Sequence, residues 1–240
     1  MKLIEFETLE STNDYCQGLS LEEVEEYTVV WAHRQTAGRG QRGNRWESEG
    51  EANLTLSVVL HPRFLEVSNQ YALTKVLALG VSDWLSEEGV ENSIKWPNDI
   101  YAGGRKICGI LVENHIGKEY ESAVCGIGVN VNQSCFGEGA PNATSLMVVT
   151  GREYDLRSEL LKMLAHIESR YEALRAGGGQ RIDEDYLKRL LNLGLERTYR
   201  YEGKEVRATI TGVTRFGHLQ LCCADGREIE CDMKEIVFMW

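Results

Sequence analysis

The most constraining feature of this sequence is a glycine-rich cationic segment, residues 34–46, which reads RQTAGRGQRGNRW. Its three glycines fit the G-x-G-x-x-G pattern of a dinucleotide-binding turn, and a strand-like run, 28–32, precedes them. That fingerprint requires glycines that open a helix whose N-terminus faces a pyrophosphate. Here the next run, 53–60, alternates apolar and less apolar residues, which is the period of a strand. The order of elements therefore argues against a dinucleotide-binding fold.

Charge separates this segment from the rest of the chain. The segment contains four arginines and no acid, whereas residues 1–30 contain eight acids and one base, in a chain of net charge −11. A cationic, glycine-rich loop is suited to an anionic ligand. The overall acidity argues against binding to bulk nucleic acid, which needs a broad basic face. We therefore expect a small anion or a basic partner, and no DNA.

Length and cysteine content bound the class of protein. A chain of 240 residues allows one large domain, or one with a small appendage. The seven cysteines form no C-x-x-C pair, which indicates reduced packing thiols in a cytosolic protein. The N-terminus has no targeting signal, and no apolar run reaches the ~18 residues of a membrane span. We expect a cytoplasmic protein that does not bind membranes.

Hydrophobic periodicity predicts mixed secondary structure up to about residue 193. The expected strands are 3–8, 28–32, 53–60, 93–96, 106–114 and 120–131. The expected helices are 12–21, one starting near Ser68, one from Asp155 to Gly177, and 183–192. Past Gly194 the sequence changes to short strands at 198–201, 205–213, 218–222, 227–231 and 235–238. We predict a larger domain, 1–193, and a small β-barrel, 194–240.

The run Lys95-Trp96-Pro97-Asn98-Asp99 marks the end of a strand. Proline lacks an N–H and keeps the preceding residue extended, so the strand should end at Trp96 with Asn98 and Asp99 in the following turn. These two residues either only shape an Asx turn or contribute to a site. In the second interpretation Asp99 lies near the arginine loop and accepts from a ligand N–H or holds Mg²⁺ on a nucleotide.

Three residues in later strands are further candidates. Lys106 is either a solvated residue of a sheet edge or a group that stabilises developing negative charge. Gly109, three positions on, removes a side chain where a ligand can approach the backbone. Asn130 stands in a β-branched run, so its amide should meet either backbone or the edge of a ligand. The residues alone leave both alternatives open for Lys106 and for Asn130.

Taken together, five motifs resemble the biotin protein ligase family and occur in that family's order over about residues 3–135. They are Glu10-Ser11-Thr12-Asn13; Gln35 with Gly38-Arg39-Gly40 and Trp46; Lys95-Trp96-Pro97-Asn98-Asp99; Lys106 with Gly109-Ile110-Leu111; and Gly126-Ile127-Gly128-Val129-Asn130-Val131-Asn132. The C-terminal strands resemble that family's SH3-like domain. Each motif is weak alone, whereas the ordered set is specific.

The resemblance implies an α+β fold with a mixed β-sheet and helices, of the class II aminoacyl-tRNA synthetase and biotin synthetase type, plus the C-terminal SH3-like β-barrel. It also implies an ATP-dependent ligase that converts biotin to biotinyl-5′-AMP. Biotin would then pass to a specific lysine of the biotin carboxyl carrier protein of biotin-dependent carboxylases. Biotin, ATP and Mg²⁺ are the implied ligands. A cationic loop suits this chemistry because charge spreads over the phosphate and water must be kept from the anhydride.

The resemblance also assigns roles to residues. The implied biotin-binding residues are Ser11, Thr12, Gln35, Gly38, Arg39 and Gly109. The implied ATP- or adenylate-binding residues are Arg39, Arg42, Arg45, Trp46, Asn98, Lys106 and Asn130. Lys106, Arg39 and Asp99 would be catalytic. Trp46 would stack on adenine, and Asp99 would orient the acceptor lysine or hold Mg²⁺.

The chain departs from the family pattern in two places. Gln41 and Asn44 stand where basic residues are common, so our hypothesis is that Arg42 or Arg45 reaches the phosphate instead. The first family motif already occurs at residue 10, so we expect a monofunctional ligase without the N-terminal DNA-binding domain of bifunctional members. We expect a monomer or weak homodimer.

Other functions fit part of the pattern. A lipoate protein ligase shares the adenylation chemistry, but that class usually has a Gly-Gly-Gly run with a nearby histidine where this chain has the Gly38-Arg39-Gly40 loop. A non-catalytic biotin or nucleotide sensor would keep the cavity without turnover. A plain α/β domain with a solvated arginine loop requires five ordered motifs to coincide. We also predict that the loop 38–46 is mobile without ligand and orders over the adenylate.

Overall fold

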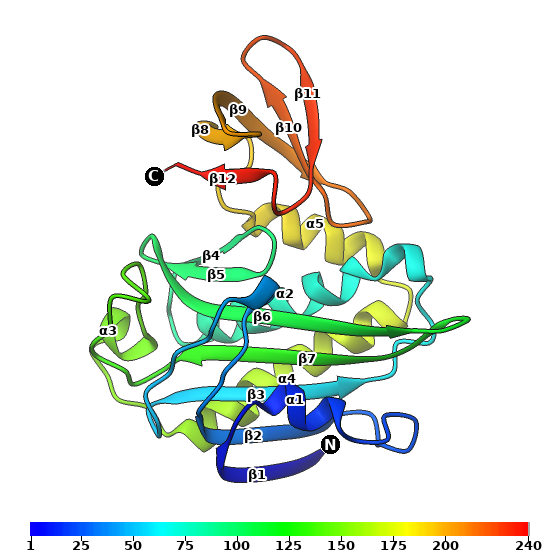
Figure 1. Cartoon of the computed structure of the whole chain (residues 1–240), viewed down its shortest axis with the longest axis vertical. Helices are drawn as coiled ribbons and strands as arrows, with labels where there is room; N and C mark the ends of the chain where they lie inside the picture. Colours follow the sequence, from blue (N-terminus) through cyan, green and yellow to red (C-terminus); the bar gives the residue numbers. More distant parts are fainter. Residues whose placement is uncertain (240) are drawn as a thin grey trace.

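A computed structural model describes residues 1–239, with the side chain of Arg42 excepted. A seven-stranded mixed sheet, in the order β1-β2-β3-β7-β6-β5-β4, forms the centre of the molecule (Figure 1). Its strands are β1 (Lys2–Leu9), β2 (Thr28–Gln35), β3 (Asn53–Leu60), β4 (Asn92–Lys95), β5 (Asp99–Ala102), β6 (Arg105–Ile116) and β7 (Tyr120–Asn130). Strands β1 and β2 are parallel, and the other neighbours are antiparallel. The predicted mixed α+β fold is confirmed.

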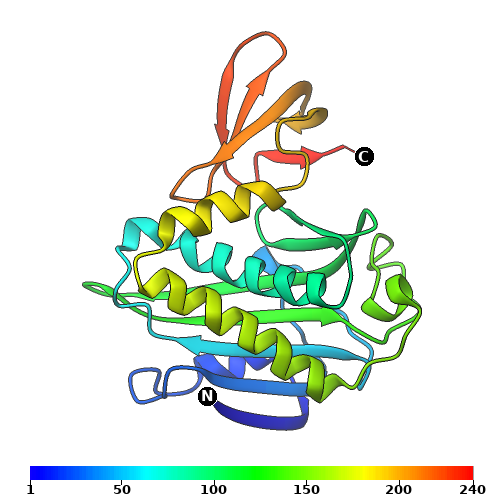
Figure 2. The same ribbon diagram turned by 180° about the vertical axis from the view of Figure 1, so that it is seen from behind.

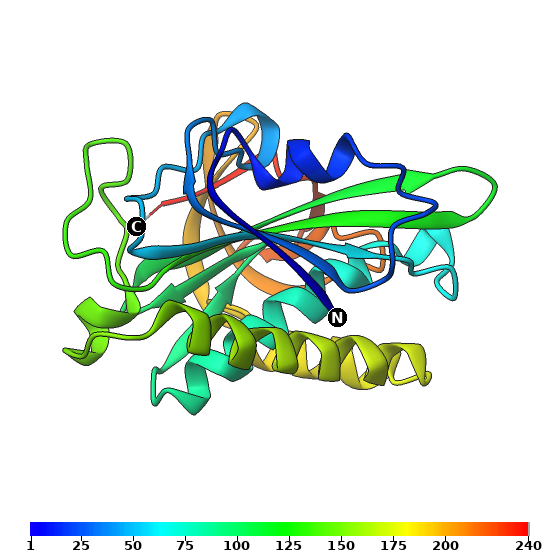
Figure 3. The ribbon, with the colours of Figure 1, turned by 90° about the horizontal axis from the view of Figure 1, so that it is seen from below.

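Helices cover the two faces of this sheet unequally. The long helices α2 (Tyr71–Glu87) and α4 (Leu156–Arg175), with α5 (Gly179–Arg189), lie on one face (Figure 2). The short α1 (Thr12–Gln17) lies on the opposite face (Figure 3). Helices α2 and α4 pack closely at Gly80. A Cβ at this position would stand 2.6 Å from Ile167 Cγ1 on α4, so the contact requires glycine. The face under α1 is therefore left partly open, and the site is built there.

Strand β3 shows how one sequence pattern serves both faces. The apolar set, Leu54, Leu56, Val58 and Leu60, packs into the main hydrophobic core with α2. The alternate residues Asn53, Thr55 and Ser57 are equally buried, although they are polar. Each buried polar group needs a partner, and Thr55 donates to Ala32 O at 2.6 Å while the Ser57 hydroxyl contacts Thr12 and Asn13.

A second, antiparallel sheet follows α5 in the order β11-β10-β9-β8-β12. Its strands are β8 (Glu196–Tyr201), β9 (Lys204–Val213), β10 (Leu219–Cys223), β11 (Glu228–Cys231) and β12 (Ile236–Phe238). All five were predicted from the change of sequence texture past Gly194. This sheet joins the hydrophobic core of the larger one. The indole N–H of Trp96 also donates to Gly217 O at 2.9 Å, which ties the second sheet to the turn after β4.

Several predicted boundaries were wrong. Helix α1 ends at Gln17 rather than residue 21, where the N–H of Gly18 bonds to Asp14 O. Helix α5 runs from Gly179 to Arg189 rather than 183–192. Strand β5 and the short helices α3 (Leu146–Thr150), η1 (Gln41–Gly43) and η2 (Val67–Asn69) were not predicted. Elements of three to five residues are too short to show a hydrophobic period.

The cysteines agree with the composition-based prediction of packing thiols. All seven cysteines are free, and five of them are buried. Burial raises the pKa of the Cys16 thiol to about 12, as expected for an inert packing thiol. Across residues 1–239, no helix combines the length and the apolar character that crossing a membrane requires.

Candidate active site

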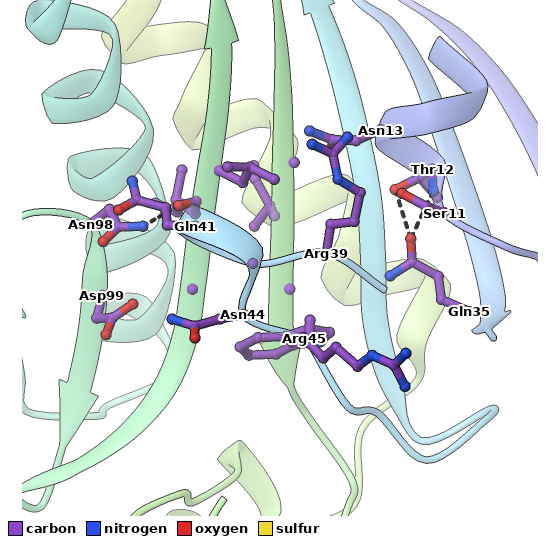
Figure 4. A pocket seen from close by; sticks show the side chains of 18 of the residues that line it. Ser11, Thr12, Asn13, Gln35, Arg39, Gln41, Asn44, Arg45, Asn98 and Asp99 are labelled. Carbon is purple, nitrogen blue, oxygen red and sulfur yellow. Dashed lines mark hydrogen bonds between the residues drawn. The ribbon is translucent and has the colours of Figure 1, made fainter. Parts of the chain in front are cut away.

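A cavity of about 270 Å³ lies between α1, the loop after β2, the turn before β5, and strands β6 and β7 (Figure 4). It brings together residues that are far apart in the sequence. The predicted site residues that line it are Ser11, Thr12, Gln35, Arg39, Arg45, Trp46, Asn98, Asp99, Lys106 and Gly109. The five sequence motifs therefore converge on one site.

One end of the cavity is lined by neutral hydrogen-bonding groups, which we call the ring end: Ser11, Thr12, Asn13 and Gln35, with Ser57 buried behind Thr12 and Asn13. Ser11 caps α1, its hydroxyl accepting from Asp14 N at 3.3 Å. Thr12 donates to Gln35 Oε1 from its backbone N–H at 2.7 Å and from its hydroxyl at 3.1 Å. Figure 4 shows Gln35 turned with this oxygen toward α1. The amide of Gln35 therefore has one orientation.

The glycine-rich loop folds back on itself. Trp46 N–H donates to Gly38 O at 2.9 Å, and Gly40 N–H donates to Asn44 O at 2.8 Å. A Cβ at Gly38 would stand 2.5 Å from Trp46 O, so the close approach of the two limbs requires glycine there. No helix begins at these glycines except the three-residue η1. The rejection of the dinucleotide-binding fold is confirmed.

Trp46 lies across two glycines of the central sheet. A Cβ at Gly128 on β7 would stand 2.4 Å from Trp46 Cε2, and a Cβ at Gly109 on β6 would stand 3.0 Å from Trp46 Cζ3. Lys106 Nζ lies 5.6 Å from the centroid of the indole ring. The indole N–H is buried without a hydrogen-bond partner among the described residues. The glycines therefore make room for a flat aromatic surface beside a cation.

The other end of the cavity is charged, and we call it the phosphate end: Trp46, Asn98, Asp99 and Lys106. Lys106 Nζ forms an ion pair with Asp99 Oδ1 at 2.7 Å. Strand β6 lies between β5 and β7, so Lys106 is not the solvated residue of a sheet edge. Nearby, burial lowers the pKa of Lys95, although the charge of Asp99 opposes this shift. The ammonium of Lys106 therefore faces the cavity with Asp99 as its counter-ion.

Arg39 is also paired in this structure. Its guanidinium contacts Asp14 Oδ1 at 2.5 Å and Glu113 Oε1 at 2.7 Å. Partial burial lowers the pKa of Arg39, but the hydrogen bonds that it donates to Glu113 and Asp14 outweigh burial and raise it overall. Arg39 therefore lies over the ring end, tied to α1 and β6.

The departure from the family pattern lies inside the cavity. Gln41 and Asn44 both line it, as does Arg45. In Figure 4 the Arg45 guanidinium points away from Asn98 and Asp99, whereas Asn44 points toward Asp99. The side chain of Arg42 lies outside the described residues. That Arg42 or Arg45 replaces the missing arginine stays a prediction.

Some predicted site residues lie elsewhere than expected. Among the described residues, Gly38 and Asn130 do not line the cavity. The Asn130 amide donates to Thr144 O at 3.0 Å, so the backbone alternative is the one realised. Asp99 is the first residue of β5 rather than part of the turn. Asn98 stays in the turn, where its amide donates to Ile110 O.

Sequence reasoning missed several residues of the site. Asn13 and Gly128 belong to the quoted motifs but received no role. Ser57 and Glu113 carried no local signal, since a serine or glutamate in a strand is ordinarily a solvated residue. Met233, between β11 and β12, lines the cavity from the C-terminal sheet. A glycine inside a buried strand does signal close approach, so Gly128 was within reach.

The residues present fit a nucleotide-borne magnesium ion better than a resident metal. Asp99 is the one carboxylate among the lining residues that the structure describes. In residues 1–239 no group of three or more His, Cys, Asp or Glu side chains is placed to hold a metal. Mg²⁺ commonly takes one or two carboxylates and completes its shell with phosphate oxygens and water. One carboxylate beside the ammonium of Lys106 is compatible with that arrangement.

Comparison with known proteins places this geometry in a family. The model of the Biotin/lipoate A/B protein ligase family matches residues 5–130, more than half of the chain. The chain belongs to this family. A relative from Paracoccus denitrificans, named Biotin--[acetyl-CoA-carboxylase] ligase, is 31% identical over 83% of this chain and 86% of its own length.

Other family members extend the comparison. The bifunctional ligase/repressor BirA of Bacillus subtilis is 34% identical over 70% of this chain and 53% of its own length. The chain thus spans about half the length of that curated relative. A solved structure described as biotin protein ligase from Aquifex aeolicus in complex with biotin and ATP matches with a TM-score of 0.83 and 30% identity, over 99% of this chain and 98% of that one. The whole described fold is therefore that of a family member.

Proposed function

We propose that this chain is an ATP-dependent biotin protein ligase. It activates biotin to biotinyl-5′-AMP and transfers biotin to a specific lysine of biotin carboxyl carrier protein. The carrying observation is that one cavity joins the neutral ring end, through Arg39, to the phosphate end with Lys106 and Asp99. The names of the relatives and the ligands of the Aquifex aeolicus structure support the same assignment.

The ring end is suited to the ureido ring of biotin. Ser11, Thr12 and Gln35 offer hydroxyl and amide groups at fixed positions on α1 and β2. A cyclic urea needs donors for its oxygen and acceptors for its N–H groups, and buried polar groups of this kind discriminate strongly against a ligand that lacks them. The valeryl chain would then pass over Gly109, which has no side chain to obstruct it.

The first step is an in-line displacement at the α-phosphorus of ATP. A biotin carboxylate oxygen forms the new P–O bond while the bond to pyrophosphate breaks. Lys106 and Arg39 bind the oxygens on which charge increases, which requires that they exchange Asp99 and Glu113 for the ligand. The loop 38–46 covers the mixed anhydride and keeps water from it.

Trp46 provides the surface on which we place adenine, with Asn98 toward the phosphates. Arg45 would have to turn from its direction in Figure 4 to reach them. Asp99 would contribute one oxygen to Mg²⁺ carried by ATP, which screens the phosphate charge. Asn130 acts through the backbone: its amide donates to Thr144 O, and Thr144 N–H donates to Lys106 O at 2.9 Å. We infer that Asn130 holds the strand segment that carries Lys106 rather than contacting the base.

In the second step the carrier lysine attacks the carbonyl carbon of the anhydride, and AMP leaves. The proton that the amine loses passes to the departing AMP or to water, and Asp99, which pairs with Lys106, would orient the amine. Lys106 again binds the oxygens that develop charge. The partner is therefore a carrier domain whose lysine reaches the phosphate end.

Two measurements test this function. Biotin-dependent release of pyrophosphate from ATP tests the first step, and mass spectrometry of one biotin on a carrier-domain lysine tests the second. Lipoate in place of biotin is the matched control, because a lipoate ligase would release pyrophosphate with it. Biotin binding without pyrophosphate release would instead indicate a sensor, and either result would overturn the proposal.

We extend the proposal to the organisation of the chain. The antiparallel C-terminal sheet is inferred to be an SH3-like barrel, with the boundary between the two units at 193/194. Limited proteolysis should cut near this boundary.

The net charge of −11 supports a protein that does not bind operator DNA, which a mobility-shift assay tests. Sedimentation tests the expected monomer or weak homodimer, and cell fractionation the cytoplasmic location.

A further inference from the structure

A chain of buried hydrogen bonds lies behind the ring end. It begins at Glu113 on β6, whose Oε2 accepts from Asn13 Nδ2 at 2.8 Å. Asn13 Oδ1 lies 2.6 Å from Ser57 Oγ on β3, and Ser57 Oγ lies 2.7 Å from Thr12 Oγ1. Thr12, Asn13 and Ser57 are at most 4% exposed. The proposed mechanism uses Thr12 to contact the ligand and Glu113 only as a counter-ion of Arg39, and gives Asn13 and Ser57 no role.

The direction of each bond follows from the carboxylate. A carboxylate that already accepts from the Arg39 guanidinium can only accept, so Asn13 must turn its NH₂ group toward Glu113. Asn13 Oδ1 then faces Ser57, whose hydroxyl must donate to it. Ser57 has a single proton, so across the contact with Thr12 the serine oxygen is the acceptor.

Thr12 has no proton left for a ligand. Because the serine oxygen accepts, the Thr12 hydroxyl proton is directed to Ser57 at 2.7 Å and only shared with the more distant Gln35 Oε1 at 3.1 Å, so it stays within the protein. Gln35 Oε1 also accepts from Thr12 N–H at 2.7 Å, so the other side of this amide offers its NH₂ group. The ring end thus presents an acceptor at Thr12 and a donor at Gln35.

We propose that Glu113, Asn13 and Ser57 are positioning residues that fix the Thr12 hydroxyl as a hydrogen-bond acceptor for a ring N–H. The inference rests on the proposed function, because it takes the ligand to be the ureido ring of biotin. A ring that lacks an N–H at this position meets an oxygen lone pair and is rejected. Recognition of the ring is thus determined by a carboxylate that lies three side chains behind Thr12.

The packing around Asn13 supports a fixed amide. Gly126 on β7 lies directly under it, and a Cβ there would stand 2.3 Å from Asn13 Oδ1. The same sheet position pairs with Ser57 across β3 and β7. The glycine thus makes room for an amide that links α1 to the sheet.

The test compares ligands that differ in one donor. Biotin and desthiobiotin share the ureido ring, whereas analogues methylated at either ring nitrogen lose one N–H. Calorimetry without ATP should show that the wild type binds one methylated analogue about 5- to 100-fold more weakly than biotin, the range expected for an unpaired buried polar group. Ser57→Ala should reduce this ratio several-fold, with biotin and desthiobiotin affected equally.

Thr55→Val is the matched control for Ser57→Ala. Thr55 is a buried hydroxyl on the same face of β3, but it donates to Ala32 O and takes no part in the chain of hydrogen bonds from Glu113 to Thr12. It should lower thermal stability without changing the ratio between biotin and the methylated analogue. A ratio that falls equally in both variants would show a general loss of packing and would overturn the inference.

Glu113→Gln decides the case even if Ser57→Ala does not fold. Its amide oxygen would stay on Arg39 and turn the NH₂ group toward Asn13, which reverses the chain, so the ratio should fall at least several-fold. Asp14→Asn is the control, because Asp14 also pairs with Arg39 but does not touch Asn13. An unchanged ratio in Glu113→Gln sinks the inference, whereas a wild type that does not bind biotin sinks the proposed function.

Discussion

The two ends of the cavity are organised in opposite ways. At the ring end, Thr12, Gln35 and Ser57 hold one another with neutral hydrogen bonds that a ligand need not disturb. At the phosphate end, Lys106 already forms an ion pair with Asp99. Arg39, which lies over the ring end, is also paired, with the carboxylates of Asp14 and Glu113. A ligand must therefore displace protein counter-ions to reach these cations.

The difference indicates that each end contributes something different to the reaction. Neutral groups fixed in the free protein give specificity, because mismatched donors or acceptors stay unpaired when buried. Lys106 and Arg39 are neutralised by protein carboxylates in the absence of ligand. A phosphate carries a larger negative charge than one carboxylate, so it can take their place as the partner of these cations. Variants at the two ends should accordingly separate binding of biotin from its activation.

The largest expected effect is at Lys106. Lys106→Met should lower biotin-dependent pyrophosphate release by about 10²- to 10³-fold, since it removes a charge from the oxygens that gain charge. Biotin affinity measured by calorimetry without ATP should change less than about 3-fold. Lys118→Met, at the exposed β6–β7 turn, is the control and should match the wild type. A parallel loss of biotin affinity would mean that the two ends are not separable.

The loop should respond when both ends are filled. Hydrogen exchange of amides in 38–46 should slow about tenfold with biotin and ATP together, and much less with biotin alone. The reason is that only the adenylate supplies the negative charge to which the arginines can turn. The C-terminal β10–β11 turn serves as an internal reference. Equal exchange with and without ligands would contradict the proposed lid.

Filling the space under Trp46 should disturb the phosphate end selectively. Gly128→Ala places a Cβ 2.4 Å from the indole, and such overpacking costs on the order of 1–3 kcal/mol. ATP affinity should therefore fall roughly tenfold, while biotin affinity is retained. Gly137→Ala is the control, because a Cβ there meets nothing within 4 Å. A variant that loses biotin first would place Trp46 at the wrong end.

A smaller effect is expected from the two arginines that could replace the one missing at Gln41. Arg45→Ala or Arg42→Ala should speed dissociation of biotinyl-5′-AMP about 3- to 10-fold, as one charge-assisted hydrogen bond is lost. Single-turnover release of labelled adenylate measures this rate, with Arg105→Ala as the control. Unchanged dissociation in both variants rejects the substitution hypothesis.

The smallest effect is expected at Asp14. Asp14→Asn removes one partner of Arg39 but leaves Glu113, and exposed ion pairs contribute only about 0–1 kcal/mol. The rate of pyrophosphate release should rise or fall by less than about 3-fold. A large increase in this rate would show that the ion pair with Asp14, rather than the conformation of the ligand-free loop, keeps Arg39 from the ligand.

The sequence allowed much of the fold to be predicted, because long elements have a clear period. The alternation in 53–60, the helix that begins at Asp155 and the strands past Gly194 all appear in the structure. Strand β5 was missed because its four residues lie between the turn after β4 and the glycine turn at 103–104. The β5 strand moved Asp99 from a turn into the sheet, opposite Gly109.

The site was predicted less completely. Motifs located Ser11, Thr12, Gln35, Lys106 and Trp46, since each stands in a short local pattern. Glu113 and Met233 have no such pattern, and their contribution depends on strands brought together by the fold. Asn130 was correctly identified as a buried amide, but its partner, Thr144 O, comes from a loop that has no periodicity.

By itself the sequence determined that 53–60 is a strand, that the glycine loop does not open a long helix, and that the chain carries an ordered set of ligase-like motifs. Only the tertiary structure decided which polar groups face one another. Asn13 meets Ser57 44 residues away and Glu113 100 residues away. The direction of a hydrogen bond is a property of the pair, so Thr12 becomes an acceptor only once the whole chain has folded.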